Sequence, residues 1–191
     1  MREAALPSST AVLVLDMTRD SIAPEARAVD RRKAILAPTR TYLDWARGKG
    51  MPVVFVCSAR RRTDKWFLKH WELANEIWKP GQEPIPELFE RDKDTVVHKR
   101  RYSAFFASDL EITLREMEVD ALQLIGWSTS LAVATTAIDA WQAGFPSTVL
   151  SDLTIAHAWG GHTVEENQKW SLDYIAAMAK SRIASSGELM K

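Results

Sequence analysis

Residues 11–16 read Ala-Val-Leu-Val-Leu-Asp, a run of five apolar side chains that stops at an acidic one. An apolar run of this length without polar alternation is typical of a strand that is buried on both faces of a parallel sheet. Similar short, mostly apolar segments recur along the chain, at residues 52–56, 95–98, 121–125, 147–150 and 182–184. We expect each of these segments to form a strand.

Amphipathic segments separate these strands. Apolar side chains at helical spacing predict helices over residues 29–48, 108–117, 130–143 and 163–180. Strands that alternate with helices predict an α/β fold, in which helices cover both faces of a mostly parallel sheet. We therefore expect a single three-layer α/β/α domain over residues 1–191 with a six-stranded sheet. Its irregular segment at about 59–92, rich in Arg, Trp and Pro, is expected to be an insertion.

The composition is that of a globular protein. Of the 191 residues, 46% are hydrophobic and 26% are charged, which excludes intrinsic disorder. Lys and Arg together number 25, and so do Asp and Glu, so no global field attracts nucleic acid or an anionic membrane. The single cysteine, Cys57, excludes an internal disulfide, and the sequence shows neither an apolar leader nor a run of about 20 apolar residues. We expect a cytoplasmic protein that binds neither nucleic acid nor a membrane.

Charged side chains stand where two of the predicted strands end. Asp16 follows the first strand and Lys99 the third, and ligands of parallel α/β sheets bind outside the carboxyl ends of the strands. If both side chains enter one crevice, each lowers the cost of burying the other, and together they can transfer a proton beside a nucleophile. The spacing alone favours a simpler interpretation, in which Asp16 caps a turn and Lys99 is a solvated loop residue.

The segment Gly126-Trp127-Ser128-Thr129-Ser130 is expected to link the fourth strand to a helix. Successive backbone N–H groups at the beginning of a helix form a site for an anion or an oxyanion. Any connection from a strand to a helix offers such a site, so this signal is weak on its own.

Taken in order, several of these segments resemble the isochorismatase-like cysteine hydrolases. The resemblance extends from about residue 10 to about 185 and rests on Val14-Leu15-Asp16-Met17, on Lys99 with Tyr102-Ser103-Ala104-Phe105, on Ile125-Gly126 with Thr129 and Ala137, and on Asp152. It implies hydrolysis of a small amide, ureide or imide C–N bond without a cofactor. It also implies that the chain associates into a homo-oligomer, a dimer or a tetramer.

The amidase members of this family use an Asp–Lys–Cys triad, and the resemblance assigns its roles to residues of this chain. Asp16 takes the thiol proton and later returns a proton, while Lys99 orients Asp16 and helps to keep the thiolate charged. The N–H groups of Ser128 and Ala132 form the oxyanion hole, next to a cis peptide bond between Trp127 and Ser128. The nucleophilic cysteine falls at position 132, where this chain has alanine.

Ala132 leaves three interpretations open. It replaces the cysteine of an amidohydrolase, which makes this chain inactive; it belongs to a natural cysteine-free enzyme in which Asp16 protonates a vinyl ether, as is implied for isochorismatases; or it belongs to a natural protein that only binds. We favour the first, because Asp16, Lys99 and the turn are intact. Cys57 ends an apolar strand, where cysteines behave as small hydrophobes, so we do not expect it to replace the missing nucleophile.

The candidates for substrate contact lie in or near the predicted loops. Arg60 and Arg61, which begin a run continued by Arg62, are candidates for holding an anionic or carbonyl-rich substrate. A solvated charge run or an interface is the alternative. Four further side chains are candidates for the pocket wall: Trp66, Phe105, Trp127 and His157. The tryptophans could instead be structural or serve an interface, and His157 could lie at the surface.

The stretch after the second strand, Ser58 to Asp64, carries one carboxylate and no histidine. One carboxylate without nearby histidines is a poor metal site. Nicotinamidases of the family that this chain resembles carry a metal site after the second strand, so we predict that no metal is bound and disfavour a nicotinamidase. The resemblance also implies that the partner is a small amide-type molecule.

Overall fold

Strands and helices follow one another along the chain in the order that the sequence predicts. The structure is a computed structural model that describes residues 9–26, 28–61, 63–70 and 82–191, apart from the side chains of residues 67, 68 and 70. Its elements are β1 (Thr10–Leu15), η1 (Arg19–Ile22), α1 (Val29–Ala34), α2 (Leu36–Gly48), β2 (Val53–Ser58), α3 (Lys65–His70), β3 (Thr95–Lys99), α4 (Leu110–Glu116), β4 (Ala121–Trp127), η2 (Thr129–Val133), α5 (Ala134–Gln142), β5 (Ser147–Ile155), α6 (Val164–Met178), β6 (Arg182–Ala184) and α7 (Ser186–Leu189). The helix expected over residues 29–48 is divided at Ile35, and η1, α3 and α7 are not predicted by the sequence.

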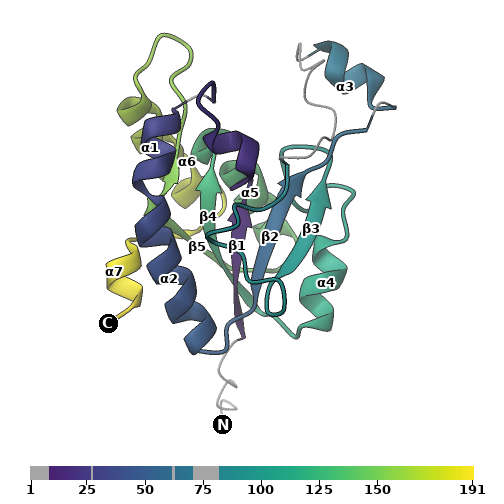
Figure 1. The fold of residues 1–191 in the computed structure, drawn as a ribbon, viewed down its shortest axis with the longest axis vertical. Coiled ribbons are helices and arrows are strands. Elements are labelled where there is room, and N and C mark those ends of the chain that lie inside the picture. The colour runs from purple at the N-terminus through teal and green to yellow at the C-terminus, as the bar shows by residue number, and fades with distance from the viewer. Residues whose placement is uncertain (1–8, 27, 62, 71–81) are drawn as a thin grey trace.

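The six strands form one sheet in the order β3-β2-β1-β4-β5-β6, and every neighbouring pair is parallel. The expected α/β fold with a six-stranded sheet is confirmed, and the sheet is parallel throughout (Figure 1). β2 and β3 extend the sheet from one side of β1, whereas β4, β5 and β6 extend it from the other. Ligands of such sheets bind outside the carboxyl ends of the strands at this switch point, between β1 and β4.

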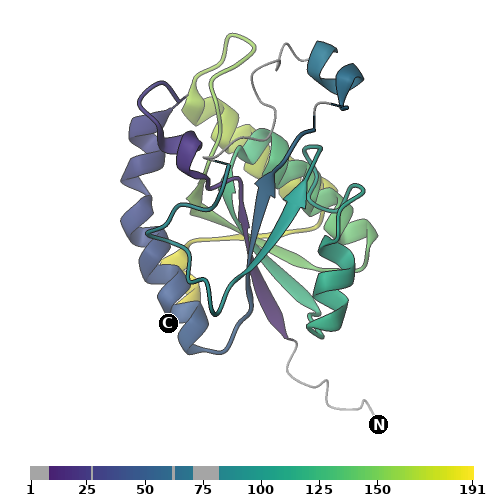
Figure 2. The ribbon, with the colours of Figure 1, turned by 45° about the vertical axis from the view of Figure 1, so that its right-hand side comes forward.

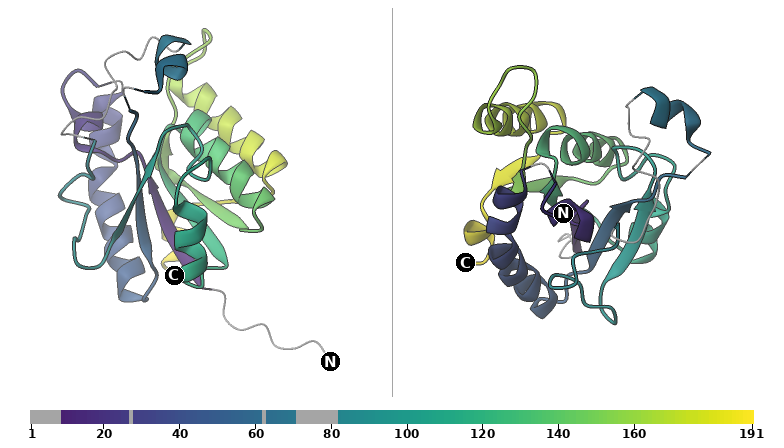
Figure 3. Two further views of the ribbon diagram at one scale, coloured as in Figure 1. Left: turned by 90° about the vertical axis from the view of Figure 1, so that its right-hand side faces the viewer. Right: turned by 45° about the horizontal axis from the view of Figure 1, so that its top comes forward.

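Two layers of helices enclose the sheet (Figure 3). α2 and α7 lie on one face, and α4, α5 and α6 lie on the other. Successive side chains of a strand point to opposite faces, so Leu13 and Leu15 of β1 pack toward α4–α6 while Val12 and Val14 pack toward α2. All four are fully buried, which explains why this run shows no polar alternation.

β4 extends further than the sequence predicts, through Gly126 to Trp127. Gly126 has a φ of +114° and pairs with Leu15 of β1, and a Cβ at this position would lie 2.1 Å from the Leu15 carbonyl oxygen. The glycine therefore allows two backbones to approach closely and does not break the strand.

β5 is also longer than expected and reaches Ile155, so Asp152 lies inside the strand and not after it. Leu124 of β4 pairs with Val149 of β5, and Gly126 pairs with Thr154. Between these two pairs β5 spans five residue steps and β4 only two. The extra residues form a bulge, which leaves no break in the sequence pattern. Asp152 then accepts a hydrogen bond from the N–H of Ser186 at 2.8 Å, at the beginning of α7.

The segment 59–92 is only partly irregular. It contains the short helix α3, which stands above the carboxyl ends of β2 and β3, outside the layers (Figure 2), while residues 71–81 lie outside the described part of the chain. Ile85 and Leu88 are fully buried in the core beside α2. Within the described residues, each helix is too short or too polar to cross a membrane.

Candidate active site

Asp16 and Lys99 form an ion pair at the carboxyl ends of the strands. Lys99 Nζ lies 2.7 Å from Asp16 Oδ2. Ser58, at the end of β2, contacts both: its N–H and its hydroxyl donate to Asp16 Oδ1 at 3.1 and 2.9 Å, and its Oγ accepts from Lys99 Nζ at 3.2 Å. The three side chains therefore form one hydrogen-bonded cluster at the ends of three neighbouring strands.

The backbone around Asp16 positions its carboxylate. Asp16 has a φ of 53°, a left-handed conformation that turns the chain directly after β1. Its N–H still donates to the Val56 carbonyl of β2 at 2.9 Å, so the turn begins while the residue is held to the sheet. The register of β2 and β3 pairs Ser58 with Lys99, which brings the ammonium to the same edge.

The two members of the pair differ in burial. The Lys99 side chain is 1% exposed and that of Asp16 is 21% exposed. Lys99 also donates to the carbonyl oxygen of Arg101 at 3.2 Å. An ammonium with a counter-charge and hydrogen bonds tolerates burial, whereas an isolated one would cost several kcal/mol. The carboxylate is therefore the member of the pair that a substrate can reach.

A cis peptide bond and a short π-helix follow β4. The Trp127–Ser128 peptide bond is cis. Ser128 precedes η2, a short π-helix, and its carbonyl accepts from the N–H groups of Leu131 and Val133, each at 3.1 Å. Ala132 lies within η2 and is buried, yet within the described residues it belongs to neither hydrophobic cluster of the core.

The register of β1 and β4 brings the ion pair and the turn to the same place. Leu15, the last residue of β1, pairs with Gly126 of β4. Asp16 directly follows Leu15, and Trp127 and Ser128 directly follow Gly126, so the two segments begin side by side. The strand order reverses between these two strands. The ion pair and the turn into η2 therefore lie where parallel α/β sheets bind ligands.

Gln168 of α6 holds the turn in place. Its Oε1 accepts from the Thr129 hydroxyl at 2.9 Å and from the Ala156 N–H at 2.7 Å, and its Nε2 donates to the Thr154 carbonyl at 3.2 Å. The side-chain amide thereby fixes the beginning of η2 against the end of β5. Nothing in the helical pattern of residues 163–180 indicates this role.

Arg32 of α1 is a buried arginine beside the turn. Its guanidinium carbon lies 5.0 Å from the centre of the Trp127 ring. Nη1 donates to the Ser21 carbonyl at 2.8 Å, and Nη2 lies 3.0 Å from Nε2 of His157. Burial lowers the pKa of Arg32 to about 10, against the opposing effect of nearby carboxylates, that of Asp16 first. Trp127 and His157, both predicted to contact substrate, thus meet at an arginine that was not predicted.

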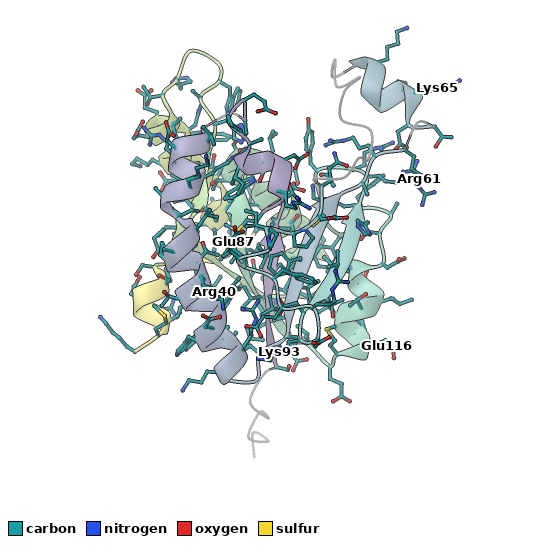
Figure 4. The ribbon with its side chains drawn as sticks, in the orientation of Figure 1. Arg40, Arg61, Lys65, Glu87, Lys93 and Glu116 are labelled. Atoms are coloured by element: carbon teal, nitrogen blue, oxygen red, sulfur yellow. The ribbon has the colours of Figure 1, made fainter. Side chains whose placement is uncertain are left out.

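The arginine run after β2 is divided by the structure. Arg60 is buried, the Arg61 side chain is exposed near α3 (Figure 4), and Arg62 lies outside the described residues. The Arg61 N–H donates to Asp64 Oδ2 at 2.8 Å. Arg100 Nε donates to Asp64 Oδ1 at 3.1 Å, and this hydrogen bonding lowers the pKa of Asp64 to about 2. The loop is therefore fixed to the end of β3 through the Asp64 carboxylate.

The remaining predicted contacts are spread over the molecule. Trp66 lies on α3 and is 68% exposed. Phe105 packs on Phe145 in the core, with ring centres 5.7 Å apart. The structure thus places Trp127 and His157 beside the turn, Trp66 at the surface and Phe105 against the core. In the described part of the chain, no three His, Cys, Asp or Glu side chains are grouped as metal ligands.

Cys57 is buried in β2. Burial raises the pKa of its thiol well above the usual range, and the negative charge of Asp16 acts in the same direction. The thiolate is the nucleophilic form, so burial disfavours a nucleophilic role for this cysteine. Cys57 is the single cysteine of the chain, so the chain offers the ion pair no other thiol.

The chain is similar to proteins that share one domain. The family model described as the Isochorismatase domain matches residues 10–184. The uncharacterized isochorismatase family protein YwoC of Bacillus subtilis (strain 168) is 37% identical over 68 residues, a match that spans 36% of this chain and 36% of that protein's length. Ureidoacrylate amidohydrolase RutB of Caulobacter segnis is 25% identical over 193 residues, which cover 87% of this chain and 80% of that protein.

A solved structure has the same fold. The crystal structure of N-carbamoylsarcosine amidase from Thermoplasma acidophilum matches with a TM-score of 0.77 and 26% identity, over 93% of this chain and 96% of that one. The family model spans nearly the whole chain, from the first residue of β1 to the last residue of β6. The chain therefore belongs to the isochorismatase family.

Proposed function

We propose that this site is built to hydrolyse the C–N bond of a small amide, ureide or imide, with Asp16 and Lys99 as two members of an Asp–Lys–Cys triad and position 132 as the place of the third. The observation that carries the proposal is the 2.7 Å contact between Asp16 and Lys99 at the switch point of the sheet, where the turn into η2 begins. With alanine at position 132, the chain binds such a substrate and does not form a covalent intermediate.

With a thiol at position 132, each group has a defined task. Asp16 takes the thiol proton, the thiolate attacks the carbonyl carbon, and the N–H groups of Ser128 and residue 132 stabilise the oxyanion. Asp16 then gives the proton to the leaving amine as the C–N bond breaks, and it deprotonates the water that hydrolyses the thioester. Lys99 orients the carboxylate and supplies its counter-charge throughout.

The names of two similar proteins support an amide-type bond as the target. RutB is an amidohydrolase of ureidoacrylate, and the protein from Thermoplasma acidophilum is an amidase of N-carbamoylsarcosine. Both names describe hydrolases that act on a bond between a carbonyl carbon and nitrogen.

The Ala132→Cys protein tests the proposal. Release of ammonia or amine is measured against a panel of primary amides, ureides and imides, with Ala132→Ser and the double variant Ala132→Cys/Asp16→Asn as controls. We expect turnover by Ala132→Cys and a loss of at least about 10²-fold in the double variant, because general acid–base catalysis contributes that much. If Ala132→Cys is inactive on the whole panel and the chain with Ala132 binds no amide, the proposal is wrong.

The alanine itself favours a second candidate, the cysteine-free hydrolysis of a vinyl ether. Asp16 and Lys99 are paired without any help from residue 132. Asp16 can then protonate the vinyl carbon, and water adds to the resulting cation and returns a proton, so that the product separates into a carbonyl compound and an alcohol. Turnover of isochorismate by the chain as it stands, lost in Asp16→Asn, would establish this candidate. If the chain with Ala132 binds an amide, and neither this chain nor Ala132→Cys turns over any substrate, the protein is a binding protein.

A further inference from the structure

Within the described residues, the buried positive charge of Arg32 beside the turn has no counter-charge in contact. Arg32 is 7% exposed, and its Nε is buried without a hydrogen-bond partner. Its two hydrogen bonds go to the Ser21 carbonyl at 2.8 Å and to His157 Nε2 at 3.0 Å. A guanidinium has only donors, so the His157 nitrogen must accept, which requires a neutral ring. Both partners of Arg32 are therefore uncharged.

The neighbouring arginine shows the contrast. Arg31 is half-exposed and pairs with Glu165 of α6. No carboxylate of a described residue forms such a pair with Arg32, although the charges of Asp16 and Asp20 act on it from a distance. Charged side chains are almost never fully buried without a paired charge. Arg32 thus keeps both a positive charge and donor capacity that the described residues do not use.

Arg32 lies next to the chemistry that is proposed for this site. Its guanidinium stacks on Trp127 at 5.0 Å, and the following residue is Ser128, whose N–H is one of the proposed oxyanion donors. His157 contacts Arg32 and also lines a cavity of about 460 Å³ between α1 and the loop after β5. His157 therefore contacts the guanidinium and also contributes to the lining of this cavity.

We infer that Arg32 is the anion-binding residue of this site, and that the substrate is a small compound with a carboxylate beside its amide-type C–N bond. The inference rests on the proposed hydrolysis and names its substrate class. The carbonyl group lies at the turn, and the carboxylate accepts hydrogen bonds from Arg32 and supplies the missing counter-charge. Arg61, whose side chain is exposed near α3, is not needed for this contact.

Matched probes test the inference by calorimetric titration of the chain with Ala132. Malonamate, succinamate and glutaramate each carry one primary amide and one carboxylate, and their neutral diamides have nearly the same shape. For each matched pair of probes, the measured quantity is the dissociation constant of the diamide divided by that of the amide carboxylate. We expect at least one carboxylate to bind about tenfold or more tightly than its diamide.

Variants assign this ratio to Arg32. Arg32→Met should bring the ratio to about 1, and Arg32→Lys, which keeps a charge but not the planar donor fork, should leave an intermediate value. Arg40→Met, at a half-exposed arginine of α2 that pairs with Asp44, is the matched control and should keep the ratio of the unmodified chain. A purely structural role of Arg32 would weaken both probes together and leave their ratio unchanged. That result would overturn the inference, as would a ratio of about 1 in the unmodified chain. Arg32→Lys decides the question if Arg32→Met does not fold.

The Ala132→Cys protein separates this inference from the proposed hydrolysis. If it hydrolyses the amide carboxylates and the diamides equally well, the hydrolysis stands and the role of Arg32 is overturned. If the carboxylates bind in an Arg32-dependent way and no amide is hydrolysed, the anion site stands and the proposed hydrolysis is wrong.

Discussion

Lys99 Nζ contacts Asp16 Oδ2 at 2.7 Å across a strand that belongs to neither residue. Asp16 follows β1, Lys99 ends β3, and β2 lies between them. Ser58, the last residue of β2, is hydrogen-bonded to both. The order of the strands, and not proximity in sequence, therefore creates the pair.

Removing one member of this pair should cost more stability than removing both. Asp16→Asn leaves the fully buried Lys99 ammonium without its counter-charge, and we expect the free energy of unfolding to fall by about 3 kcal/mol. Lys99→Met leaves a carboxylate that water still reaches, so the expected loss is about 1–2 kcal/mol. Urea denaturation of the two single variants and of the double variant gives the interaction free energy between Asp16 and Lys99. Strictly additive losses would show that the two side chains do not interact.

The close approach of β1 and β4 should make Gly126 sensitive to substitution. Gly126 and Gly144 both have a positive φ, of +114° and +85°, but a Cβ would meet the Leu15 carbonyl oxygen at 2.1 Å at the first position and nothing within 4 Å at the second. We expect Gly144→Ala to cost about 1 kcal/mol from backbone strain alone. Gly126→Ala should cost about 3 kcal/mol or more, because the strands must separate. Equal shifts of the urea midpoint would contradict this explanation.

The contact between Asp64 and Arg100 should make stability depend on pH in the acid range. Arg100 lowers the pKa of Asp64 from 3.8 to about 2, so the unfolded chain binds this proton more tightly than the folded one. The stabilisation is complete above about pH 4 and is lost as the pH falls toward about 2. Arg100 is partly exposed, so solvent screening makes this contribution small.

Urea denaturation of the unmodified chain and of Asp64→Asn between about pH 5 and about pH 2 checks this effect. The difference in unfolding free energy between the two proteins should shrink toward zero as the pH falls. A difference that stays constant over this range would mean that the Asp64 charge does not stabilise the fold.

The buried strands and the charged residues that end them can be predicted from the sequence. In a chain where strands alternate with helices, an unbroken apolar run such as residues 11–15 predicts a strand that is buried on both faces of the sheet. The ends of β4 and β5 cannot be predicted in this way. A glycine such as Gly126 looks the same in the sequence whether it breaks a strand or lets a neighbouring backbone approach.

Arg32 shows why part of the site is hidden in the sequence. In the run Asp30-Arg31-Arg32-Lys33 it resembles one more solvated charge, and only its spacing of three and four residues from Ile35 and Leu36 indicates an inward position. Its contacts are Trp127 and His157, which lie far along the chain. The partner of an inward-facing arginine is set by the tertiary fold, which no local pattern encodes.

Thiol reactivity at position 132 tests the site without knowledge of the substrate. In Ala132→Cys, we expect the buried Cys57 to stay unreactive toward iodoacetamide under native conditions, because burial raises the pKa of its thiol. Alkylation then reports on the introduced thiol, and the unmodified chain serves as the blank. We expect rapid alkylation near neutral pH, because Lys99 and the N–H groups of the turn stabilise the thiolate. Lys99→Met in this background should slow alkylation by about tenfold or more, whereas Asp16→Asn, which removes a negative charge, should not slow it. An introduced thiol that reacts no faster than Cys57, or one whose rate is unchanged by Lys99→Met, would contradict the claim that the ion pair acts on residue 132.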